Sequence, residues 1–318
     1  MISIYVLILA LLLGLSVLSL TIGVAEFSLG AVFTDQQTRD LFFLSRLPRT
    51  LAPLLTGASM AVAGVIMQLL VRNRFVEPAT TGTAEAAMLG LLIVTVLAPG
   101  MPIFGKMVCA ALAALIGMAG FLVLIRNLPP EQPLLIPLVG LIYSGIIGAG
   151  TVFVAYQVDL IQYLGTWMNG EFSGVLAGRY ELLWLAGILV LVAYIAADQF
   201  TVAGLGRAAS LNLGLKYGQV LALGMASVAC VTALVVVTVG LLPFIGLVVP
   251  NVVSRLMGDN LRRSLPAVAG LGAGLVLMSD IIGRVVRYPY EIPAGTVFGV
   301  IGAVVFLWIL LRPGARRV

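Results

Sequence analysis

The feature that most constrains this chain is a long uncharged run, residues 50–71, enclosed by arginines. Arg46 and Arg49 precede the run, and Arg72 and Arg74 follow it. At a rise of 1.5 Å per residue, a helix over this run would be roughly 33 Å long, enough to cross the hydrocarbon core of a bilayer. A helix on a soluble protein keeps one polar face, and this run has none. The run therefore predicts a transmembrane helix with a basic collar at each end.

Composition extends this prediction to the whole chain. Of 318 residues, 61% are hydrophobic and only 10% are charged, whereas a soluble domain needs about a quarter of its residues charged. A transmembrane barrel would show alternating segments of about ten residues, which are absent here. The fold class predicted is an all-α polytopic membrane protein. The net charge of +5 comes from basic residues scattered at helix ends, a pattern of membrane topology and not of nucleic-acid binding.

Several kinds of chemistry are excluded or disfavoured by missing residue types. The chain has no histidine, so histidine metal sites and histidine-dependent triads are ruled out. Cys109 and Cys230 each lie in an apolar run and are expected to be packing residues without a disulfide. No GxxxxGK[ST] phosphate loop occurs, so the chain carries no P-loop ATPase of its own. We expect no catalytic residue, no metal and no cofactor.

Ten apolar runs predict about ten transmembrane helices within one integral domain, residues 1–318. The first run has no basic n-region and exceeds the length of a signal peptide, so it is expected to be an uncleaved helix. The eighth contains Pro243 and Pro250 and is expected to be a broken or half-depth helix, and residues 160–168 form a short amphipathic piece. The runs are 2–24, 50–71, 84–99, 103–125, 134–156, 180–197, 217–242, 243–257, 265–283 and 293–311.

The distribution of basic residues predicts that both termini are cytoplasmic. This orientation places most of the lysines and arginines on the inner side, as the positive-inside rule requires. It leaves Arg46, Arg49 and Arg284 at the outer side, where they need a separate explanation.

Four segments in order resemble the FecCD-type permeases, the membrane subunits of ABC importers for iron-siderophore complexes, haem and cobalamin. Three substitutions depart from the family pattern: Asn251 stands where histidine is frequent, Arg207 where an acidic residue is frequent, and Arg74 where proline is frequent. The segments are RLPRTLAPLLTGASMAVAGVIMQLLVRN (46–73), LGRAASLNLG (205–214), FIGLVVPN (244–251) and SDIIGR (279–284).

The resemblance implies a fold like that of type II ABC importer permeases and a non-catalytic transport function. It implies a path for an iron-siderophore, in the bacterial cytoplasmic membrane, with haem or cobalamin as alternative cargoes. The implied partners are ABC ATPase subunits that hydrolyse ATP, a substrate-binding protein, and a second permease copy that is identical or related.

The resemblance also implies three groups of functional residues. Outer arginines would pair with carboxylates of the binding protein, and the competing explanation is that they anchor helix ends by snorkelling. A cytoplasmic loop would hold a short helix against the ATPase, and the loop after the second helix would narrow the exit. The docking residues are Arg46, Arg49 and Arg284; the coupling residues are Leu205, Gly206, Arg207, Ala208, Leu213 and Gly214; the gate residues are Asn73 and Phe75.

Two functions of other classes were weighed against a transport subunit. An autonomous secondary transporter needs ionisable residues near the membrane midplane, and an intramembrane enzyme needs a constellation of reactive groups. The acids Asp280 and Glu291 are expected near the outer rim and Glu85 near the inner end of the third helix, so neither alternative is favoured. The translocation path is expected to be weakly selective and lined by Gly, Ser, Thr and Met.

Overall fold

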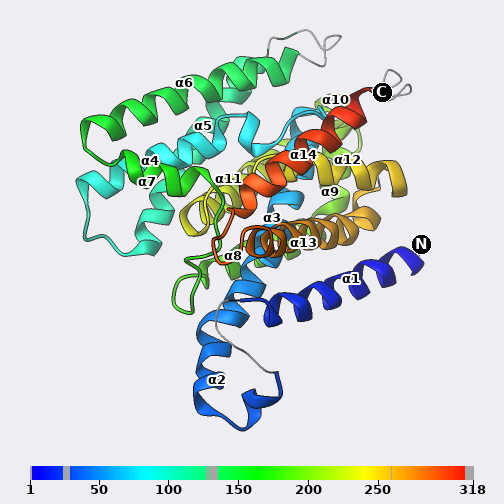
Figure 1. The fold of residues 1–318 in the computed structure, drawn as a ribbon. Helices are drawn as coiled ribbons and strands as arrows, with labels where there is room; N and C mark the ends of the chain where they lie inside the picture. The colour runs from blue at the N-terminus through cyan, green and yellow to red at the C-terminus, as the bar shows by residue number, and fades with distance from the viewer. Residues whose placement is uncertain (1, 24–28, 127, 129–134, 259, 312–318) are drawn as a thin grey trace.

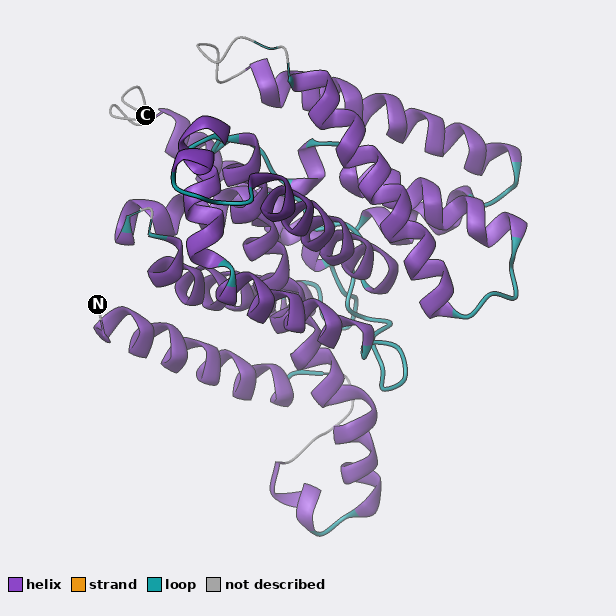
Figure 2. Ribbon diagram, turned by 180° about the vertical axis from the view of Figure 1, so that it is seen from behind, coloured by secondary structure: helices purple, strands orange, loops and turns teal. Residues whose placement is uncertain are grey.

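The computed structural model describes residues 2–23, 29–126, 128, 135–258 and 260–311, and this part of the chain contains helices and no strand (Figures 1 and 2). The elements are α1 (Ile2–Thr21), η1 (Leu29–Phe33), α2 (Gln36–Leu41), η2 (Phe42–Arg46), α3 (Leu47–Val71), η3 (Pro78–Thr80), α4 (Thr83–Leu97), α5 (Ile103–Ile125), α6 (Leu135–Gln157), α7 (Ile161–Met168), α8 (Leu182–Ile195), α9 (Ala197–Gly204), α10 (Arg207–Asn212), α11 (Tyr217–Thr238), α12 (Ile245–Met257), α13 (Leu261–Val285) and α14 (Ala294–Leu311).

The helices confirm the predicted polytopic membrane fold. Within the described residues, six helices are long and apolar enough to span a membrane, and α8 and α9 form one further span bent by 66°. Three shorter apolar helices, α4, α12 and α14, complete the set. Together they correspond one to one with the ten apolar runs of the sequence, and α7 matches the short amphipathic piece.

Helix α3 lies at the centre of the molecule, and the other elements are arranged around it. It packs against α13, α12, α11, α8 and α9, while α1 packs mainly against α13 (Figure 1). Helices α4, α5, α6 and α7 form the opposite flank (Figure 1). The uncharged run that dominates the sequence is therefore the core of the fold and not a lipid-facing helix.

Glycines allow α3 to approach its two main partners at backbone distance. A Cβ added to Gly57 would overlap the carbonyl oxygen of Gly272 in α13, and one added to Gly64 would overlap that of Gly246 in α12. Lipid tails are as apolar as the helix faces, so helices in a bilayer associate through close packing of small residues and not through the hydrophobic effect. The two crossings fix α12 and α13 against the central helix.

Two boundaries differ from the sequence prediction. The helical path into α3 begins at Gln36 and passes through the π turn Phe42–Arg46, so Arg46 and Arg49 lie within the helix and not in front of it. The sequence prediction started the helix at residue 50 because Arg46 and Arg49 are charged. In the structure Arg49 can lie within the helix because carboxylates of other segments neutralise it, as described below. The predicted run 180–197 ends earlier, because the chain bends after Ile195 and continues as α9.

The eighth run is short, as its prolines predict. Helix α12 has 13 residues, about 20 Å, and is preceded by Phe244, whose φ of +66° lies in the left-handed region. Pro250 has no N–H and cannot donate to the carbonyl of Gly246 one turn earlier. The side-chain amide of Gln68 donates to that carbonyl oxygen instead, at 3.1 Å. A polar residue in the last turn of α3 thus satisfies the backbone group that proline leaves free.

Both ends of the described chain lie on one side of the molecule. The start of α1 and the end of α14 lie at the right in Figure 1, where α10 also lies, and at the left in Figure 2. This arrangement agrees with an even number of membrane crossings.

Candidate functional site

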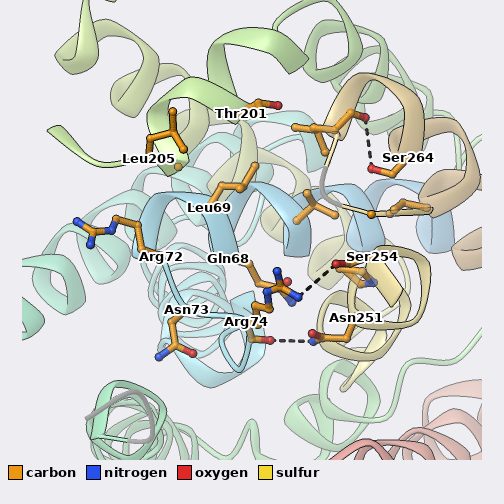
Figure 3. Close-up of a pocket in the computed structure, with 16 residues that line it drawn as sticks. Gln68, Leu69, Arg72, Asn73, Arg74, Thr201, Leu205, Asn251, Ser254 and Ser264 are labelled. Atoms are coloured by element: carbon orange, nitrogen blue, oxygen red, sulfur yellow. Dashed lines mark hydrogen bonds between the residues drawn. The ribbon is translucent and has the colours of Figure 1, made fainter. Parts of the chain in front are cut away.

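The predicted gate and the predicted coupling loop meet around one cavity of about 420 Å³ at the end of α3 (Figure 3). The end of α3 and the residues after it form one wall, α9 and the turn after it form the second, and α12 and the start of α13 form the third. The lining residues are Val65, Gln68, Leu69, Arg72, Asn73, Arg74, Thr201, Gly204, Leu205, Pro250, Asn251, Ser254, Gly258, Leu261, Ser264 and Val268.

Helix α12 holds the residues that follow α3. The Nδ2 of Asn251 donates to the backbone carbonyl of Arg74 at 2.8 Å and also to the carbonyl of Leu247 at 2.7 Å (Figure 3). The Nη1 of Arg74 donates to the Oγ of Ser254 at 3.3 Å. Two of the departures from the family pattern, Arg74 and Asn251, therefore lie in contact and join two walls of the cavity.

The two gate residues are packed into the protein. The Oδ1 of Asn73 accepts a hydrogen bond from the backbone N–H of Phe75 at 2.8 Å, which forms a tight turn after α3. The ring of Phe75 packs against Phe306 of α14, with ring centroids 6.2 Å apart. Asn73 lines the cavity and Phe75 does not. Their role as a gate stays a prediction.

The coupling loop folds into the short helix that the sequence predicts. Gly206, with φ of +98°, precedes α10, and Gly214, with φ of +78°, follows it. The hydroxyl of Ser210 donates to the carbonyls of Val202 and Gly206 and thereby ties α10 to α9. Leu205 and Leu213 are 62% and 66% exposed, so the loop presents an apolar surface outward.

The end of α3 and the coupling loop are in direct contact. The guanidinium group of Arg72 lies against Gly206, because a Cβ added to that glycine would be 2.9 Å from Nη1. Leu69 lies against Gly204 in the same way. A displacement of α10 would therefore be transmitted to the end of α3 without an intervening element.

Sequence reasoning did not identify the contact that fixes the start of α12. The Oε1 of Glu77 accepts a hydrogen bond from the backbone N–H of Phe244 at 2.9 Å, and the carboxylate lies at the positive end of the helix dipole. Burial raises the pKa of Glu77, in the loop between α3 and α4, to about 7. The acid could have been noted from the sequence because it follows the gate residues and precedes Pro78.

At the other end of α3, the three predicted docking arginines are brought together. Arg284 is 4% exposed and donates to Asp280 and to the carbonyls of Ser19 and Ile22. Arg46 is 7% exposed and donates to the same carbonyl of Ile22 at 2.5 Å. The two arginines thereby tie the end of α1 to α3 and α13.

Arg49 is the most exposed of the three. Its Nη1 and Nη2 donate to the two carboxylate oxygens of Glu291 at 2.9 and 2.5 Å, and Nη2 lies 3.6 Å from Asp280. The side chains of Arg49 and Glu291 are 16% and 26% exposed. These five charged side chains are called the outer cluster, after the membrane side predicted for them. The cluster has a buried part, formed by Arg46, Asp280 and Arg284, and a pair that solvent can reach, formed by Arg49 and Glu291.

Comparisons with known proteins agree with this geometry. The model of the FecCD transport family matches residues 6–312. A petrobactin import system permease of Bacillus subtilis (strain 168) is 45% identical over 303 residues, which cover 95% of this chain and 96% of the relative. A ferric-anguibactin transport system permease of Vibrio anguillarum is 40% identical, covering 92% of each chain.

A solved inward-facing conformation of a metal-chelate type ABC transporter has the same fold. Its TM-score to this chain is 0.82 at 23% sequence identity, and the match covers 98% of this chain and 99% of the other. This likeness supports the helical arrangement described above, and at this identity it carries no statement about cargo.

Loss of the buried carboxylate of the outer cluster should lower the free energy of unfolding far more than loss of an exposed carboxylate elsewhere in the chain. Asp280→Asn leaves the buried Arg284 without its charge partner and should lower the free energy of unfolding by about 3–5 kcal/mol. Asp198→Asn removes an ion pair with Arg262 whose side chains are more than half exposed, and should leave stability unchanged. Denaturant unfolding of the two purified variants measures this, and equal stability of both would contradict the assigned role of the cluster.

Proposed function

Because the chain belongs to the FecCD transport family, we propose that it is the permease subunit of a bacterial ABC importer that carries a ferric siderophore. The match over residues 6–312, together with the 45% identity to a petrobactin permease along nearly its whole length, carries this proposal. The chain itself supplies a membrane path and no catalytic site. Separate ATPase subunits hydrolyse ATP, and a substrate-binding protein delivers the chelate from outside.

The location follows from the same family membership. The chain is a multi-pass protein of the bacterial cytoplasmic membrane, with one integral domain over residues 1–318 and both termini on the cytoplasmic side. The common side of the α1 start and the α14 end supports an even number of crossings (Figure 1). The basic residues near the inner loops support the orientation.

The coupling loop is the contact with the ATPase. The loop exposes Leu205 and Leu213 on either side of its short helix, and the helix itself exposes Arg207 and Ala208. An amphipathic helix laid in a groove of a partner is a common mode of protein recognition. The contact of Gly206 with Arg72 makes the loop and the end of α3 move together, so that a push on α10 reaches the gate residues Asn73 and Phe75.

The working complex contains two permease copies. An ABC importer needs two membrane halves, and this chain shows no internal duplication, so a second identical or related permease completes the path. Native mass measurement of the assembled complex should find two permease and two ATPase chains, and an active complex with one permease chain would contradict this arrangement.

Reconstitution tests the proposed function directly. Proteoliposomes that contain this permease, its ATPase and its binding protein should accumulate radioactive iron from ferric petrobactin when ATP is present. Vesicles without the ATPase should accumulate none. Uptake by the permease alone, driven by an ion gradient, would instead identify an autonomous secondary transporter.

Glycine substitutions test the coupling loop. Alanine at Gly206 or Gly214 must adopt a positive φ, which costs about 1–3 kcal/mol and should displace α10. Gly218 at the start of α11 has helical geometry and open space around it, so Gly218→Ala is the matched control. ATP-driven uptake should fall several-fold in the first two variants, with unchanged affinity for the loaded binding protein. Normal uptake in both would remove the loop from the coupling mechanism.

Binding-protein docking is assigned to the outer cluster, with Arg49 as the group that a partner carboxylate can reach. Lysine retains the charge but not the bidentate geometry, so Arg49→Lys should weaken binding of the loaded binding protein several-fold at low salt. The loss should shrink at high salt, because salt screens exposed pairs. Arg46 and Arg284 are unsuitable for this test, since their replacement disturbs the buried part of the cluster. Unchanged affinity of Arg49→Lys at low salt would favour helix anchoring.

A further inference from the structure

A second groove, of about 250 Å³, opens between α4, α6 and α7, away from the inner cavity and from the outer cluster. Most of its lining is apolar or small, and one ionisable side chain, Glu85, belongs to it. The lining residues are Glu85, Met88, Ser144, Gly145, Gly148, Ala149, Thr151, Val152, Leu164, Met168 and Leu241.

Glu85 has an unsatisfied oxygen. The residue lies in the first turn of α4, and the Ser144 side chain of α6 hydrogen-bonds to its carboxylate. The Oε2 atom is buried and has no hydrogen-bond partner among the residues that the structure describes. Nearly all buried polar groups in proteins are hydrogen-bonded, so an orphan carboxylate oxygen calls for a missing partner.

Two glycines of α6 lie beside Glu85 in the groove and have room for a larger side chain. A Cβ added to Gly148 would lie 3.7 Å from the Cγ of Glu85, and Gly145 has no atom within 4 Å of such a position. The neighbouring side chains Ile142 and Ile146 are 58% and 67% exposed, so no other described part of the chain covers this face of α6.

The carboxylate of Glu85 determines whether this face of α6 contacts lipid or water. An ionisable group within a transmembrane bundle is costly against lipid and is usually found facing the protein interior or a water-filled cavity. A groove that is lined by a carboxylate therefore suits water and solute and not acyl chains. The remaining lining of small, hydroxyl and apolar residues offers no competing charge.

We propose that this groove is a water-filled station of the translocation path, where Glu85 attracts cationic or hydrogen-bond-donating groups of the passing chelate. The inference rests on the proposed transport function and adds a residue that biases the path. The path, expected to be lined by small and neutral residues, thus also contains one carboxylate, whose Oε2 accepts a hydrogen bond from the passing chelate.

Charged thiol reagents test both the water and the charge. Cys109 and Cys230 are first replaced by alanine, and Gly148→Cys or Gly145→Cys is introduced in the complete importer in proteoliposomes. The rate at which each thiol reacts is measured with a cationic and with an anionic methanethiosulfonate. The ratio of the cationic to the anionic rate for free cysteine in solution is the reference. In the groove this ratio should be about tenfold or more above the reference. Adding Glu85→Gln should return the ratio to that of free cysteine.

Two results would overturn the proposal. Failure of both thiols to react with either reagent would mean that the groove is not aqueous. A charge preference that survives Glu85→Gln would mean that the carboxylate does not act on the groove. Iron uptake by the same vesicles, measured alongside, separates this proposal from the proposed function, because labelling requires no transport.

Discussion

The hydrogen bond from the Gln68 amide to the Gly246 carbonyl is the contact on which the inner half of the molecule depends. Pro250 removes the N–H that would normally pair with this carbonyl, and in a bilayer no lipid group can replace it. Gln68 can reach the carbonyl only because Gly64 and Gly246 let the backbones of α3 and α12 touch. Glu77 then fixes the first turn of α12 through Phe244. The proline, two glycines, an amide and a carboxylate together hold a half-depth helix in place.

This junction connects the elements on which the proposed transport mechanism relies. Helix α12 holds the residues after α3 through Asn251, and the end of α3 contacts the coupling loop through Arg72. The outer end of the same central helix is held by a different kind of contact, a buried charge cluster around Arg284 and Asp280. Helix α3 is thus fixed at both ends while its middle stays apolar. A central helix of this kind can transmit a displacement along its length.

Much of the fold could be predicted from the sequence, because each apolar run must be a helix in a bilayer. The short α12 followed from its prolines, and the short α10 from the glycines at 206 and 214. Side-chain directions could not be predicted in this way. The family resemblance implied docking for Arg46 and Arg284, but it gave no sign that their guanidinium groups donate to carbonyls at the end of α1. The partner of Gln68 could not be predicted either, since the carbonyl that it satisfies belongs to residue 246. Glu85 could be located but its free oxygen could not.

A double-mutant cycle at Gln68 and Pro250 tests the central contact most directly. Gln68→Leu alone should lower the free energy of unfolding by about 1–3 kcal/mol, because the Gly246 carbonyl loses its partner. Pro250→Ala restores a backbone N–H one turn after Gly246, so in that background Gln68→Leu should cost much less. Denaturant unfolding of the wild type, both single variants and the double variant gives the coupling. An equal cost of Gln68→Leu in both backgrounds would show that the amide does not replace the hydrogen bond that Pro250 removes.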